Sequence, residues 1–168
     1  MATTETSSLA TTELATQQFA QNLFRELQQL AIQHEAGAMA GDVESVHDMR
    51  VGIRRLRVAM NNFAVCLRKK ERKRWRARLE KLADALGGVR DLDVMIEALK
   101  RQAATRTTED RVAIAAFVSR LRARRRRTMQ SLKVYLSGEE YAEFKSGFSV
   151  EGAPSTSDSK EVRREQAA

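Results

Sequence analysis

Residues 46–57, with the sequence VHDMRVGIRRLR, combine an apolar stripe with a row of cations. At about 100° per residue, an α-helix places four basic side chains along one edge: His47, Arg50, Arg54 and Arg57. A neighbouring arc about 100° wide, typical of a core-facing stripe, carries Val46, Met49, Ile53, Leu56, Met60, Phe63 and Leu67. Guanidinium groups are planar forks that suit the oxygen pairs of phosphates or carboxylates. The row therefore predicts a polyanion-binding surface, with a merely solvated helix surface as the alternative.

The composition around this stretch favours an all-α protein. A chain of 168 residues suits one domain, and its commonest residues are good helix formers, with a single proline. Four long amphipathic patterns with short connections predict an antiparallel four-helix bundle. The single cysteine, Cys66, excludes an internal disulfide and a C-x-x-C metal motif, so we expect a small core residue there.

Helix-capping and helix-breaking residues divide the chain into expected elements. Gly87-Gly88 marks a kink, a helix boundary or a close backbone approach, and these three interpretations stay open. The expected domains are a flexible N-terminus over residues 1–9, a helical bundle over 10–150 and a disordered tail over 151–168. The expected elements are a helix from residue 8 or 12 to about 35, a break at 37–41, and helices at about 44–67, from a hinge at 68–70 to about 102, from 107 or 108 to 136, and at 139–144.

The positive charge lies in the helical part of the chain. Residues 44–136 contain 25 Lys or Arg and 10 Asp or Glu, whereas the whole chain has a net charge of +8. Such a field attracts nucleic acid, polyphosphate or an anionic membrane surface. Aromatic residues make up only 5% of the chain, which argues against a platform that stacks single-stranded bases. We find no signal segment and no apolar run of transmembrane length, so we expect a cytoplasmic protein without a membrane partner.

A second motif follows at residues 82–94, with the sequence LADALGGVRDLDV. The two motifs together resemble the CHAD domain, the conserved histidine α-helical domain, whose pattern is approximately V-H-x-M-R-V-x-x-R-R-L-R and then L-G-x-x-R-D-L-D-V. The resemblance covers about residues 10–150, the first of two related bundles in a full-length member. It implies non-enzymatic binding of inorganic polyphosphate through basic residues, often at polyphosphate granules. The absent second bundle suggests that two copies associate as a homodimer.

The resemblance also implies which residues bind the ligand: His47, Arg50, Arg54, Arg57, Arg78, Lys81, Arg90, Arg120 and Arg124. Arg90 has an alternative role as the structural partner of a carboxylate near the double glycine. Asp91 and Asp93 lie on divergent helix faces without a third ligand nearby, so we expect no metal, no cofactor and no catalysis. The alternative function is that of a basic helical protein that binds nucleic acid nonspecifically, and weak nucleic-acid binding is expected in either case.

Overall fold

The structure is a computed structural model, and it describes residues 2–147, with side chains from Thr12 onward. Within this part of the chain there are helices and no strands, so the prediction of an all-α fold is confirmed. The elements are α1 (Ala2–Ile32), α2 (Glu35–Ala40), α3 (Val43–Asn62), the 3₁₀ turn η1 (Ala64–Cys66), α4 (Lys69–Ala103), α5 (Thr108–Leu136) and α6 (Glu139–Lys145).

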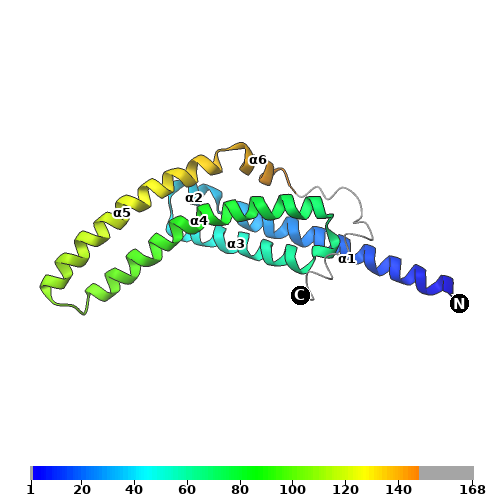
Figure 1. Cartoon of the computed structure of the whole chain (residues 1–168), viewed down its shortest axis with the longest axis horizontal. Helices are drawn as coiled ribbons and strands as arrows, with labels where there is room; N and C mark the ends of the chain where they lie inside the picture. Colours follow the sequence, from blue (N-terminus) through cyan, green and yellow to red (C-terminus); the bar gives the residue numbers. More distant parts are fainter. Residues whose placement is uncertain (1, 148–168) are drawn as a thin grey trace.

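The long helices form a body and an arm. In the body, α1 packs on α3 and α3 packs on α4, and α5 packs on α4. Figure 1 shows α1, α3 and the first half of α4 side by side, while the second half of α4 and the first half of α5 leave the body as a helical hairpin. The simple antiparallel four-helix bundle that we expected is therefore not confirmed.

Two apolar clusters hold these parts together. The body contains the main core, in which Phe24 of α1, Ile53 of α3 and Trp75 of α4 are almost fully buried. The arm has a smaller cluster of its own, made by Leu92, Ile96, Val118 and Leu121. Because each helix buries only one stripe, its opposite face remains free to carry charge.

A glycine sets the distance between α1 and α3. A Cβ atom at Gly52 would lie 3.0 Å from both the Cα and the Cβ of Ala31. Real Cβ contacts are rarely this short, so any side chain at Gly52 would push the two helices apart. The glycine between the cations of α3 therefore serves the helix crossing.

Several local expectations can now be compared with the structure. Asp42 caps α3, since its side chain accepts a hydrogen bond from the Ser45 backbone N–H at 2.8 Å, and hydrogen bonding to Ser45 lowers the pKa of Asp42. The Thr107 side chain caps α5 by accepting from the Asp110 N–H. The expected break at residues 37–41 is wrong, because α2 continues to Ala40. The helix expected over 44–67 ends at Asn62 and is followed by η1.

The first and last segments are only partly described. Residues 2–9 of the N-terminus that we expected to be flexible are helical and belong to α1. The tail predicted over 151–168 lies outside the described residues. The flexibility of both termini and the proposed domain boundaries therefore stay predictions.

Helix α6 closes one end of the body. Its aromatic residues Tyr141 and Phe144 are buried, and Gln28 of α1 donates a hydrogen bond to the Phe144 carbonyl. Lys145 pairs with Glu35 of α2 at 2.9 Å. Burial is the main cause that raises the pKa of Tyr141 above its ordinary range. Apolar burial and ion pairs thus hold this short helix over the bundle end.

Candidate functional site

A cationic groove lies between α3 and the first half of α4. It encloses a hollow of about 520 Å³, and no carboxylate lines it among the described residues. Its basic lining residues are Arg54, Arg57, Lys69, Arg72, Lys73 and Arg76. Six like charges around one hollow repel each other unless an anion lies between them.

Helical spacing explains why α4 contributes four of these cations. Lys69, Arg72, Lys73 and Arg76 are separated by three or four residues, so they share one face of the helix. A neighbouring side of the same turns buries Trp75 in the main core. Glu80 follows Arg76 by four residues and is exposed, so by helical spacing the uniformly cationic part of this face ends there.

Most groove cations have no carboxylate partner. Within the described side chains, residues 12–147, no ion pair involves Arg54, Arg57, Lys73 or Arg76. All four side chains are exposed. An incoming anion therefore meets them without first having to break an internal salt bridge.

The predicted row on α3 continues beyond the groove. Arg50 lies against the double glycine of α4, since its Nε is 3.6 Å from the position of a Cβ at Gly87. On the α5 side, a Cβ at Gly88 would lie 3.3 Å from Cγ2 of Thr128. Because α4 runs unbroken through both glycines, the helix-boundary interpretation is wrong. Both glycines lie close to side chains of neighbouring helices, and the kink stays a prediction.

His47 occupies the start of this row. It is half-buried, and its Nδ1 is buried without a hydrogen-bond partner among the described residues. A histidine that served only to fix the fold would normally have its buried nitrogen satisfied. No described residue satisfies this nitrogen, and the ligand role that the resemblance implies for His47 stays a prediction.

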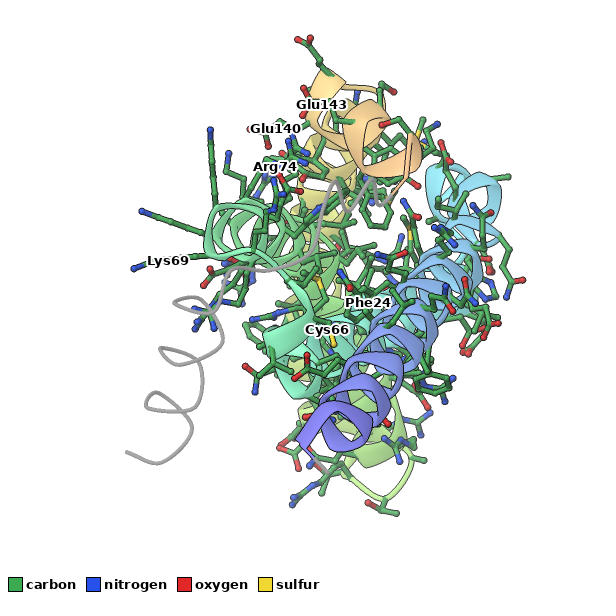
Figure 2. All side chains as sticks on the ribbon, turned by 90° about the vertical axis from the view of Figure 1, so that its right-hand side faces the viewer. Phe24, Cys66, Lys69, Arg74, Glu140 and Glu143 are labelled. Atoms are coloured by element: carbon green, nitrogen blue, oxygen red, sulfur yellow. The ribbon has the colours of Figure 1, made fainter. Side chains whose placement is uncertain are left out.

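Two predicted ligands, Arg78 and Lys81, lie on a different side of α4. Arg78 forms an ion pair with Glu143, and the Lys81 Nζ lies 2.6 Å from Glu140 Oε1. Arg74 on the same side pairs with Glu71 at 3.0 Å. Figure 2 shows Glu140 and Glu143 beside Arg74, with Lys69 pointing away from them. We call Arg74, Arg78 and Lys81 the clamp side of α4, and the structure does not bring it together with the groove.

Arg90 is half-buried, and no ion pair of this residue occurs among the described side chains. The carboxylate close to it in sequence, Asp93, has a different partner. Asp93 is buried and accepts hydrogen bonds from Nε and Nη2 of Arg125, and the same Nη2 donates to the Gly41 carbonyl at 3.0 Å. Arg125 therefore has the structural role that we considered for Arg90, and it joins α4 and α5 to the end of α2.

Arg120 and Arg124 are exposed on α5, in the arm. The Arg120 guanidinium lies 5.6 Å from the centroid of the Phe117 ring, a cation–π contact within the helix. Neither residue lines the groove. By helical spacing Arg127 shares their face of α5, while Arg122 and Arg126 lie on the other side of the helix, and all three are exposed.

Four groove residues were not among the predicted ligands, namely Lys69, Arg72, Lys73 and Arg76. We had interpreted residues 68–70 as a hinge, yet α4 begins at Lys69. The signal was present, because spacings of three and four residues place all four on one helix face. It was hidden because basic residues also fill the other sides of these turns.

Two further observations concern the described residues as a whole. No group of three or more His, Cys, Asp or Glu side chains that could hold a metal ion occurs among them. None of their helices is both long and apolar enough to cross a membrane.

The comparisons with known proteins agree with the resemblance. The family model of the CHAD domain matches residues 21–166, which is most of the chain. The chain therefore belongs to the CHAD domain family, and this family is linked to polyphosphate binding in general. The match also extends past residue 150, where we expected the domain to end. Neither the curated proteins nor the solved structures gave a significant match.

Proposed function

We propose that this chain binds inorganic polyphosphate through the groove between α3 and α4, without catalysing a reaction on it. One observation carries the proposal: six Lys and Arg side chains surround one hollow that no described carboxylate lines. A linear polyanion places successive charges within reach of such a row, and membership of the CHAD family supports this ligand.

The proposed mechanism is electrostatic. Arginine forks bind two oxygens of one phosphate, while lysines act as mobile point charges. The phosphate chain follows the groove and continues along α3 past Arg50 towards His47. Each neutralised phosphate releases counterions, so log affinity should fall with log salt at about −0.7 per contact, by analogy with single-stranded nucleic acid.

The direct test compares two triple variants that remove the same charge. Arg54→Ala/Arg57→Ala/Arg76→Ala removes groove cations, and Arg101→Ala/Arg106→Ala/Arg111→Ala removes exposed cations near the arm tip. We expect the groove variant to lose at least tenfold in affinity for long-chain polyphosphate, and its salt slope to decrease by about 2. The arm variant should stay within about threefold of the native protein. Equal losses in both variants would reject the groove as the binding site.

Absence of catalysis is part of the proposal and has its own measurement. Long-chain polyphosphate incubated with the protein and Mg²⁺ should keep its length distribution and release no phosphate. Release that increases with protein concentration would contradict a purely binding role.

A homodimer is the second part of the proposal. Family resemblance places a related second bundle beside the first, and a second copy of this chain can supply it. We expect polyphosphate to shift the sedimentation coefficient from that of a monomer to that of a dimer. Tight binding by a particle that stays monomeric would reject this part.

Nucleic acid is the alternative ligand, and the exposed arginines of α5 from Arg120 to Arg127 favour it. A duplex presents a phosphate lattice that these side chains can contact without reading bases. At physiological salt we expect long-chain polyphosphate to displace duplex DNA of equal charge. In a cell we expect a cytoplasmic protein that gathers at polyphosphate granules, which a fluorescent fusion would show.

A further inference from the structure

A second hollow lies on the other side of α3, facing α1. It measures about 420 Å³, and most of its lining residues are apolar: Leu23, Val51, Val58, Ala59 and Phe63. Phe19 extends this wall, because its ring centroid is 5.7 Å from that of Phe63. Phe19 and Val58 are 58% and 53% exposed, so the apolar surface is open to solvent.

The apolar hollow and the cationic groove share three lining residues. Arg54, Val58 and Asn62 line both of them. They are four residues apart, so they form a single row along α3. Only this row separates the apolar surface from the other five groove cations, and its middle residue is a short valine.

We infer that this row of α3, which we call the ridge, binds amphiphiles that combine one apolar chain with a phosphate or pyrophosphate headgroup. The chain lies in the hollow towards α1, and the headgroup crosses the ridge at Val58 to reach Arg57 and Arg76. The headgroup half of this inference rests on the proposed function, since it uses the same groove. The part of the inference that concerns the apolar chain of the ligand rests on the apolar hollow, because polyphosphate has no apolar part that could fill it.

Charge and shape together select this class of ligand. Arg54 and Arg55 also line the hollow, but a polyanion gains nothing from its five apolar residues, and a neutral lipid gains nothing from the cations of the groove. A ligand with both parts removes apolar surface from water and also neutralises groove cations. The part of α3 that lines the hollow, from Val51 to Asn62, is about 16 Å long at 1.5 Å per residue, which suits an extended alkyl chain.

The test uses octyl, decyl and dodecyl phosphate as monomers, below their critical micelle concentrations, in titration calorimetry. Affinity should rise by up to about fourfold for each added methylene that the hollow buries. Dodecyl maltoside, which has the chain without the charge, and inorganic pyrophosphate, which has the charge without the chain, should both bind more weakly than dodecyl phosphate. An affinity that does not change with chain length would overturn the inference.

Variants separate the two halves of the site. Val51→Gln changes the apolar hollow without touching the groove, and Val134→Gln is the matched control at an exposed valine of α5. We expect Val51→Gln to weaken dodecyl phosphate about three- to tenfold and to leave polyphosphate binding intact, while Val134→Gln changes neither. Arg76→Ala should weaken both ligands. If polyphosphate binds and dodecyl phosphate does not, the inference fails and the proposed function stands, whereas loss of both rejects the groove itself.

A further experiment distinguishes a free amphiphile from a membrane lipid. Phosphatidylcholine vesicles with and without phosphatidic acid are sedimented with the native protein and with Val51→Gln. Cosedimentation that needs phosphatidic acid and decreases in the variant would identify a membrane source of the same headgroup chemistry. Monomer binding without cosedimentation would identify a soluble ligand, and failure of both would overturn the inference.

Discussion

Two sides of α4 carry similar numbers of cations and differ in what faces them. On the clamp side, Arg74, Arg78 and Lys81 each pair with a glutamate, two of these glutamates coming from α6. On the groove side, Lys73 and Arg76 face α3, which supplies more arginines to the same hollow. Position along α4 therefore says little about function, and the charge of the facing helix decides which cations can take an external anion.

The largest expected effect comes from a variant that weakens the packing of α6, the helix that supplies two glutamates to the clamp side. Phe144 is buried, and its ring packs edge-on against Trp75 with centroids 6.4 Å apart. Phe144→Ala should lower the free energy of unfolding by about 3–5 kcal/mol, because it removes a large side chain from the core. Urea unfolding followed by the fluorescence of Trp75, the single tryptophan, measures this.

The control is Phe117→Ala, at a phenylalanine of the arm that is 43% exposed. We expect a loss below about 1 kcal/mol there, as for most surface substitutions. A similar loss in both variants would mean that α6 is not held by its buried aromatic residues.

Charge reversal gives the next largest effect and compares the two sides directly. Arg76→Glu places a negative charge among the groove cations, whereas Arg74→Glu makes the same change on the clamp side. We expect Arg76→Glu to weaken polyphosphate at least tenfold, about 1.4 kcal/mol or more, and Arg74→Glu to weaken it less than about threefold. Fluorescence anisotropy with labelled polyphosphate at two salt concentrations would rank them, and the reverse ranking would move the site to the clamp side.

Much of this architecture follows from periodicity. The apolar stripe of residues 46–67 predicted the helix that forms α3, and the helix start expected at residue 107 or 108 matches the start of α5 at Thr108, because both signals are local. Ion pairs between residues that are far apart in the sequence leave no such local signal. Nothing near Arg78 or Lys81 shows that Glu140 and Glu143 arrive some 60 residues later. The same holds for Arg125, whose partner Asp93 lies on the preceding helix.

Removing the negative charges that face the clamp side should allow its cations to make weak additional contacts with polyphosphate. Glu140→Gln/Glu143→Gln leaves Arg78 and Lys81 without a charged partner. Exposed ion pairs stabilise little, so we expect the free energy of unfolding to change by less than about 1 kcal/mol. Polyphosphate affinity should rise about two- to fivefold, measured by the same anisotropy titration.

The control for this variant makes an equal change of net charge elsewhere. Glu97→Gln/Glu109→Gln removes two exposed carboxylates from the arm. If both double variants raise the affinity for polyphosphate equally, the gain comes from net charge alone, and the clamp side then has no specific capacity for anions.

The smallest effect is expected at the end of the α3 row, where pH can change the charge of one residue. A protonated imidazole at His47 would add a cation beside Arg50, and a bound phosphate favours that protonated form. We therefore expect polyphosphate affinity to increase about two- to fivefold from pH 8 to pH 5.5. His47→Gln should remove this dependence and keep the affinity measured at pH 8, whereas His34→Gln, at the other histidine, should behave like the native protein. The same pH dependence in the native protein and in His47→Gln would make His47 a structural residue and would end the ligand row at Arg50.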